Sequence, residues 1–227
     1  MPSTDAEFLR LHLEAVWGVQ LPPVEQSKIS LLPGSPLPDW RLCVAALAAG
    51  RVSIWRPDVT PDERKQLLAR LEEVLLLPDD SEPPAGVSRE VAFRWTATPV
   101  VDYTSARRIA RPLLDDDYAL VKTFQPGDAS KLFQPGPRPL IGVIVDGRLL
   151  SLAHSSRRTA QACELGIDTL PDARRRGYAL AATIAWSAAI CQEGLTPIYS
   201  ALSTNSASLK LAVAAGYREF ARAVTLE

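Results

Sequence analysis

Apolar residues recur at helical spacing in two stretches of the first hundred residues. Each stretch follows a capping box, in which a threonine precedes a glutamate by three positions, as Thr4 precedes Glu7 and Thr60 precedes Glu63. A stripe of this kind buries one face of a helix against a neighbouring element. We therefore predict two capped helices. Their stripes contain Leu9, Leu13, Val16 and Trp17 in the first and Leu67, Leu68, Leu71, Val74 and Leu75 in the second.

Shorter apolar stretches in the same half predict strands. Val52 to Trp55 and Val91 to Trp95 have the composition or alternation of strands. Leu42 to Ala49 is short and apolar throughout, so its pattern leaves helix and strand open. Pro78 to Gly86 is acidic and rich in proline, and we interpret it as a linker.

In the second half, turn residues separate the apolar stretches. We predict a strand over Arg107 to Leu114, followed by a helix opened by Asp115–Asp117, whose carboxylates suit the helix dipole. A capped helix start is preferred here to a metal-binding triad. Ile141 to Val145 and Arg148 to His154 predict a hairpin around the turn Asp146-Gly147.

Composition narrows the classes of protein. The chain has 227 residues, 47% of them hydrophobic, enough for one large domain or two small ones. Its formal net charge of −1 offers no global attraction for nucleic acid. The three cysteines, Cys43, Cys163 and Cys191, are far apart and support neither a disulfide framework nor a zinc site, so we expect no metal.

Nothing in the sequence predicts a membrane protein. The start of the chain, Met1 to Phe8, is polar and acidic and lacks the pattern of a signal peptide. The longest nearly apolar run, Tyr178 to Ile190, is too short to span a bilayer. We therefore expect a cytoplasmic protein that does not bind membranes.

The stretch from Cys163 to Leu170, the turn after it and the apolar run that begins at Gly177 predict a strand, a basic loop and a helix. A helix N-terminus offers unpaired N–H groups and the positive end of a dipole, which suit phosphate. Arg174, Arg175 and Arg176 add positive charge beside these groups. The stretch is a candidate phosphate loop.

The spacing of the loop selects one class of phosphate loop. No Gly-Lys-Ser/Thr follows the turn, and the dinucleotide pattern would need two further glycines. Arg174, Gly177 and Ala179 match Arg/Gln-x-x-Gly-x-Gly/Ala, and this loop resembles the acetyl-CoA loop of the GCN5-related N-acetyltransferase (GNAT) superfamily.

The order of the following pieces strengthens the resemblance. A strand-like Pro197 to Ser200 is followed by a helix start at Asn205 and a helix end at Gly216-Tyr217, as in the family. Together with Thr169-Leu170-Pro171, these pieces look most like the glycine N-acyltransferase (FR47-like) branch. The first hundred residues carry none of the family's motifs.

The resemblance implies an α/β (α+β) fold, with a mixed, mostly antiparallel sheet flanked by helices. We expect an N-terminal α/β region of unknown role over residues 1–86 and the acyltransferase domain over residues 87–227. The N-terminal region is predicted to pack on the catalytic sheet and to narrow the acceptor side. The segment Pro126 to Pro139 is associated with two Gln-Pro-Gly repeats. Either it borders the acceptor site, as this region does in the family, or the repeats only form turns.

The activity implied is direct transfer of an acetyl or other acyl group from acetyl-CoA to the primary amine of a small molecule or amino acid, by a monomer or homodimer. The pyrophosphate is expected at Arg174, Arg175, Arg176, Gly177, Tyr178 and Ala179, and the pantetheine arm beside Ile167, Asp168 and Thr169. Asn205, which also suits a helix N-cap, and Ser208 complete the expected cofactor contacts.

Glu164, His154 and a water relay are the main candidates for the base that takes the proton of the amine, and Asp168 ranks after Glu164 and His154 among the residues. Glu164 lies on the strand before the loop but is one position out of register, so it would need a bulge in this strand. His154 needs only a small pKa shift to act near neutral pH, and a water relay is the third candidate. The family's thiolate-protonating tyrosine is replaced by Ala212, and Tyr199 or Ser208 are possible substitutes.

Two other functions compete with catalysis. The missing tyrosine at Ala212 favours a non-catalytic module that binds or senses acyl-CoA. Nucleic-acid binding through Arg157-Arg158 and Arg174 to Arg176 conflicts with the balanced charge and with the lack of an aromatic platform.

Overall fold

The computed structural model describes residues 4–227. Met1 to Ser3, part of the polar start of the chain, lie outside the described residues. The chain forms two compact units. Unit 1 contains the residues up to Phe93 together with Ser200–Leu209 and Glu219–Glu227, and unit 2 contains Arg94–Tyr199 and Lys210–Arg218. Strand β4 (Val87–Trp95) has residues in both.

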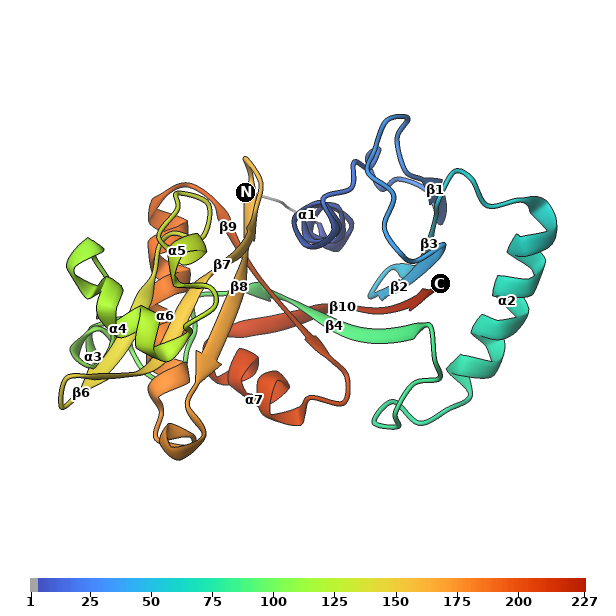
Figure 1. Ribbon diagram of the computed structural model, residues 1–227. Helices are drawn as coiled ribbons and strands as arrows, with labels where there is room; N and C mark the ends of the chain where they lie inside the picture. Colours follow the sequence, from blue (N-terminus) through green and yellow to red (C-terminus); the bar gives the residue numbers. More distant parts are fainter. Residues whose placement is uncertain (1–3) are drawn as a thin grey trace. The chain divides into compact units, whose positions relative to one another are not determined.

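Unit 1 is built on a sheet in which β2 lies between β3 and β10 (Figure 1). β2 pairs antiparallel with β3 and with β10, from Leu42 opposite Leu226 to Ala46 opposite Arg222. The sequence left helix and strand open for this stretch, and the two ladders make it a strand. The strands are β1 (Lys28–Ser30), which pairs parallel with β3, then β2 (Leu42–Leu47), β3 (Gly50–Trp55) and β10 (Tyr217–Leu226).

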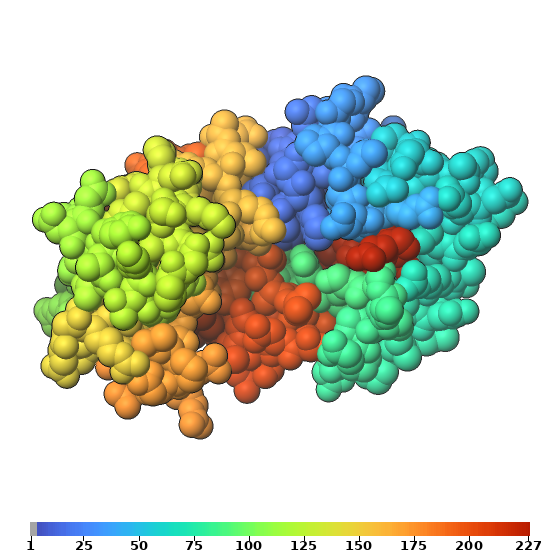
Figure 2. Space-filling view, in the orientation of Figure 1, coloured from blue at the N-terminus to red at the C-terminus, as the bar shows by residue number. Residues whose placement is uncertain are grey.

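The two predicted capped helices, α1 (Asp5–Trp17) and α2 (Pro61–Leu75), cover opposite faces of this sheet. Alternate residues of β2 point to opposite faces, and Cys43 packs in the cluster that contains α1, whereas Val44 packs in the cluster that contains α2. Both helix predictions are confirmed, but in the second stripe only Leu67, Leu71 and Val74 are buried, whereas Leu68 and Leu75 are exposed. Figure 2 shows the C-terminal residues, in deep red, beside the blue and cyan surface of the N-terminal residues of the same unit.

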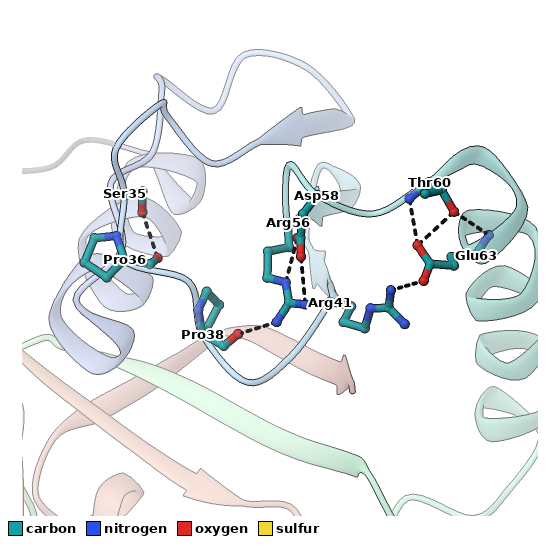
Figure 3. Close-up of polar contacts among 8 residues, drawn as sticks. All are labelled: Ser35, Pro36, Pro38, Arg41, Arg56, Asp58, Thr60 and Glu63. Carbon is teal, nitrogen blue, oxygen red and sulfur yellow. Dashed lines mark hydrogen bonds and ion pairs between the residues drawn. The ribbon is translucent and has the colours of Figure 1, made fainter.

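The start of α2 is fixed to the sheet by charged groups (Figure 3). The Glu63 side chain accepts hydrogen bonds from the main chain and the hydroxyl of Thr60, which completes the capping box. Arg41, next to β2, donates to the same carboxylate. The hydrogen bond from the Thr60 main chain, then those from Arg41 and the Thr60 hydroxyl, lower the pKa of Glu63 to about 2.

Unit 2 contains a sheet in the order β9-β8-β7-β6-β5, in which only the β8–β9 pair is parallel. The helices α3 and α6 pack on each other, whereas α4 and α5 bury Val121, Ala129 and Leu132 against Leu149 and Leu152 of β7. The strands are β5 (Arg111–Pro112), β6 (Ile141–Val145), β7 (Arg148–Arg158), β8 (Ala162–Thr169) and β9 (Thr196–Leu202). The helices are α3 (Tyr103–Ile109), α4 (Tyr118–Phe124), α5 (Ala129–Leu132), α6 (Tyr178–Gln192) and α7 (Ser206–Ala214), of which α7 enters both units.

Two expectations for this half were wrong in detail. The predicted strand over Arg107 to Leu114 begins with the end of α3 and keeps only the two-residue strand β5 (Arg111–Pro112). Helix α3 starts after Asp102, whose Oδ1 accepts the Ser105 N–H at 2.9 Å. The N-cap residue Asp102 lies before this stretch, so the pattern within the stretch alone predicts a strand. The predicted loop over Pro126 to Pro139 contains the short helix α5.

The predicted fold class is confirmed: the sheets are mostly antiparallel and flanked by helices. The hairpin around Asp146 and Gly147 forms, with φ of 49° and 73°. A short 3-10 turn at Asp115–Asp117 precedes α4, and Asp117 bonds the Leu114 N–H and Arg111. None of the helices in residues 4–227 is long and apolar enough to cross a bilayer.

Candidate functional site

The loop between β8 and α6 has the backbone geometry of an anion cradle. A 3-10 turn, Pro171–Ala173, leads into it, and Arg175 and Gly177 have φ of 60° and 78°. Gly177 is the N-cap of α6, and a Cβ built on it would meet nothing within 4 Å. The unpaired N–H groups at the start of α6 therefore follow a residue that has open space beside it.

The loop carries three guanidinium groups that the described chain does not bond. The side chains of Arg174, Arg175 and Arg176 are exposed, and within residues 4–227 none of these guanidinium groups has a hydrogen bond or an ion pair. The nearby acid, Asp172, is bound by Arg148 at 2.8 Å, which lowers the pKa of Asp172. Three free guanidinium groups beside a helix N-terminus suit a polyphosphate.

The residues that are expected to contact the pantetheine arm are consecutive on strand β8. It pairs with β7 along its length, from Cys163 to Thr169, but its ladder with β9 ends at Glu164 opposite Ile198 within this unit. The N–H of Leu170 donates to the Leu150 carbonyl. Because antiparallel pairs alternate, the main-chain groups of Ile167 and Thr169 face away from β7.

His154 lies across from β8, with its imidazole directly over Gly166. The two residues are a cross-strand pair, and a Cβ on Gly166 would lie 2.4 Å from His154 Cε1. Burial lowers the pKa of His154, while the main chain of Ser155 and the carboxylates of Asp168 and Asp128 act in the opposite direction. The ring is therefore neutral at pH 7.

Asp168 lies on the same face of β8 as Gly166, two residues further along. Its Oδ2 accepts a hydrogen bond of 2.9 Å from Gln125 Nε2, at the end of α4. Asp168 is exposed, so His154 and a solvent-accessible carboxylate share one face of the strand.

Glu164 is almost fully buried, and two side chains donate hydrogen bonds to its Oε2. Oε2 accepts from Ser156 Oγ at 2.9 Å and from Arg157 Nη1 at 3.0 Å. The irregularity that the sequence called for in β8 lies instead in β7, where Ser156 is the extra residue between Ser155 and Arg157. Strand β8 is regular, so Glu164 shares the face of Gly166 and Asp168.

The remaining predicted residues have structural roles of their own. Asn205 is in unit 1, where its Oδ1 caps α7 by accepting the Ser208 N–H at 3.1 Å. Ala212 is completely buried. Tyr217 is also buried and bonds Ser187 at 2.7 Å, and burial strongly raises its pKa.

Sequence reasoning missed Gly166, Gln125 and Arg157. A glycine inside a strand signals a close approach of another group, and Gly166 has that signal. Gln125 and Arg157 contact the site only through the packing of α4 and the extra residue in β7, which no local pattern reveals.

A family model described as GNAT acetyltransferase matches residues 141–223. This segment contains β6 to α7, the loop and most of β10. The model does not address the glycine N-acyltransferase branch, which stays a prediction. The comparison with curated proteins gave no match.

Solved structures with related folds come from several sources. A GNAT-family acetyltransferase from Colwellia psychrerythraea is 17% identical, over 77% of this chain and 75% of its own, with a TM-score of 0.52. A GNAT-family protein from Novosphingobium aromaticivorans is 23% identical over 66% of this chain and 70% of its own, with a TM-score of 0.49. The aminoglycoside N-acetyltransferase AAC(6′)-Iy, solved with a CoA bisubstrate analogue, is 21% identical over 49% of this chain and 90% of its own, with a TM-score of 0.41. At these identities the likeness concerns the fold.

Proposed function

We propose that this chain, whose residues 141–223 match a family model described as GNAT acetyltransferase, transfers an acetyl group from acetyl-CoA directly to the primary amine of a small molecule or amino acid. One observation carries the proposal. The loop from Arg174 to Gly177 combines three guanidinium groups without partners in residues 4–227, two residues with positive φ and the N-terminus of α6. That set of donors fits a pyrophosphate.

The donor site uses main-chain groups as well as arginines. The main-chain groups of Ile167 and Thr169 face away from β7 and are suited to bonding an extended amide-containing arm. Acetyl-CoA would supply the thioester, and an N–H of this same strand is suited to stabilise the oxyanion. Asn205 and Ser208 remain proposed cofactor contacts in addition to their bond within α7.

The proposed acceptor side is the face of β8 that carries Gly166. Asp168, exposed on this face, suits an ammonium group, and the neutral ring of His154 suits removal of its proton. We favour His154 over Glu164 as the base, because Glu164 Oε2 already accepts two hydrogen bonds. A water relay from either group remains the third route.

The leaving thiolate needs little help from the protein. Ala212 has no proton to give, and the hydroxyl of Tyr217 is bonded to Ser187 in the core. A thiol is a weak acid whose pKa is about 8.5, so its thiolate leaves near neutral pH and takes a proton from water.

A non-catalytic acyl-CoA-binding module is the second candidate, favoured by Ala212 where the resembled enzymes carry a tyrosine. Two measurements separate the candidates. A rise in melting temperature with CoA supports both, and release of free CoA thiol from acetyl-CoA with a panel of primary amines supports the enzyme alone. Binding without thiol release, across amino acids, polyamines and aminoglycosides, would favour the binding module. The absence of any shift with CoA would contradict both.

A further inference from the structure

Unit 1 has a pocket of its own, about 170 Å³ in volume, that the acyl-transfer proposal does not use. All of its lining residues belong to unit 1. Its floor is the face of the sheet that α2 covers, and it includes Val44 of β2, Val91 of β4 and Val224 of β10. The pocket therefore has an apolar base formed by three strands.

A small side chain produces the hollow. Ala46 of β2 is paired with Arg51 of β3 on one side and with Arg222 of β10 on the other. Directly paired residues in antiparallel strands point to the same face, so two arginines flank a methyl group. The pocket has charged walls around a shallow apolar centre.

The arginines that line the pocket differ in whether their guanidinium groups already have partners in the protein. Arg89 is buried and donates to the carbonyls of Val74 and Pro78 at the end of α2. Arg222 is bound by Glu219 at 2.8 Å and by Asp79 at 3.2 Å. Both guanidinium groups are therefore held by the protein itself.

Two donors in the pocket have no such partner. The guanidinium group of Arg51 has no hydrogen bond or ion pair in the described part of the chain. The hydroxyl of Ser203 is buried and has no hydrogen-bond partner there, although its main-chain N–H bonds the Arg89 carbonyl at 2.9 Å. An unbonded buried hydroxyl carries a free-energy cost that a ligand would remove.

We propose that this pocket binds a small aliphatic monocarboxylate. A carboxylate offers two acceptor oxygens, which match the fork of Arg51 and the hydroxyl of Ser203. A short alkyl chain matches the valines and Ala46, and the volume limits it to a few carbons. Two carboxylates also line the pocket, and neither is free to attract a cation: Asp79 is engaged by Arg222, and Glu90 of β4 has an interaction of its own.

The test is calorimetric titration of the full chain with butyrate, butylamine and butyramide, which share a size and differ in charge. We expect saturable binding of butyrate with a millimolar dissociation constant, and none of the other two. Equal or tighter binding of butylamine, or no binding of any of the three at tens of millimolar, would overturn the proposal.

Variants then locate the binding. Arg51→Gln removes the free charge, and Ala46→Leu fills the hollow. Ala46 and Arg51 are both exposed, so neither change is expected to alter the melting temperature. Each should weaken butyrate binding at least tenfold, whereas the control Lys65→Gln, on the outer face of α2, should leave it unchanged. Butyrate binding that survives Ala46→Leu would place the ligand elsewhere and refute the assignment. CoA binding, whose proposed contacts do not include the residues of this pocket, is expected to be the same in all four proteins.

Discussion

The imidazole of His154 rests on Gly166, so closely that a Cβ on the glycine would lie 2.4 Å from Cε1 and 2.6 Å from Nε2 of the ring. The ring therefore has its place only because position 166 has no side chain. We infer that Gly166 positions His154 above the strand that carries the proposed donor site. A residue of this kind acts through its neighbour and not on the substrate.

Gly166→Ala should displace His154 and lower turnover. If His154 is the base, His154→Gln should reduce kcat by about 10²–10⁴-fold, and Gly166→Ala should reproduce part of this loss. The matched control is Gly142→Ala, whose Cβ would meet Leu113 at 2.7 Å and Leu149 at 2.8 Å. Both alanine variants should lose about 1–3 kcal/mol of stability from overpacking, but only Gly166→Ala should change kcat at temperatures where both are folded.

The pH dependence of kcat/KM should identify His154. Burial lowers its pKa below 6.5, so the ring remains unprotonated, and able to accept a proton, to more acidic pH than a free histidine. We expect an acid limb with a midpoint below 6.5 that disappears in His154→Gln. The same shift predicts that stability falls as pH drops below 6.5, because the unfolded chain then binds more protons than the native state.

Glu164→Gln tests the rival base. The carboxylate is buried and bonded by Ser156 and Arg157, and we expect the change to lower stability while kcat falls less than threefold. Steady-state kinetics at several pH values and a melting curve measure the two effects. A loss of about 10²-fold or more with an unshifted Michaelis constant for acetyl-CoA would return the role to Glu164.

The loop assignment can be tested with two nearly identical side chains. Gly177 has φ of 78°, which asparagine and aspartate tolerate better than most residues. Gly177→Asp places a carboxylate beside the N-terminus of α6, and Gly177→Asn places a neutral amide of the same shape there. We expect CoA affinity, measured by titration, to fall at least tenfold more in the aspartate variant. Equal affinities would show that phosphate does not approach this residue.

The capping box of α2 predicts a pH-dependent contribution to stability. The pKa of Glu63 is lowered from 4.5 to about 2, so its stabilising effect is present above 4.5 and is lost as pH falls towards 2. The melting temperature of the native chain should therefore exceed that of Glu63→Gln at pH 6, with a difference that shrinks between pH 4.5 and 2. A constant difference over this range would rule out the charge of Glu63 as the cause.

Residues 87–227 expressed alone should aggregate. This fragment keeps the last strand but lacks α1, α2, β2 and β3, against which Phe220, Ala223 and Leu226 are buried. Size-exclusion chromatography and circular dichroism would show the outcome. A monomeric fragment that binds CoA would instead support an independent domain with the boundary predicted at residue 86.

The sequence predicted elements best where a cap and a stripe occur together. Thr4 and Thr60 each precede a stripe, and both helices begin where expected. Asp102 caps α3 just as well, but no amphipathic stripe follows it, so α3 was missed. A capping residue or an apolar stripe alone is a weak predictor of a helix, because tertiary contacts can stabilise a helix that lacks one of the two signals.

The candidate site likewise has one part that the sequence predicts and another part that it does not. The loop at Gly177 could be predicted because its parts are adjacent in sequence and its φ demands a glycine. The contact of His154 with Gly166 depends on the pairing of β7 and β8, and the extra residue Ser156 sets that pairing for Glu164. Register between strands is a long-range property that no local pattern determines.

The pairing of β2 with β10 has a consequence during synthesis. On the ribosome, α1, β2, β3 and α2 emerge before unit 2, but Glu219–Glu227, which completes their sheet, emerges only after it. Until then the edge of β2 that pairs with β10 is free. We expect the nascent chain to depend on chaperones throughout elongation, and the loss of a few C-terminal residues, starting with the fully buried Leu226, to leave the whole unit unfinished.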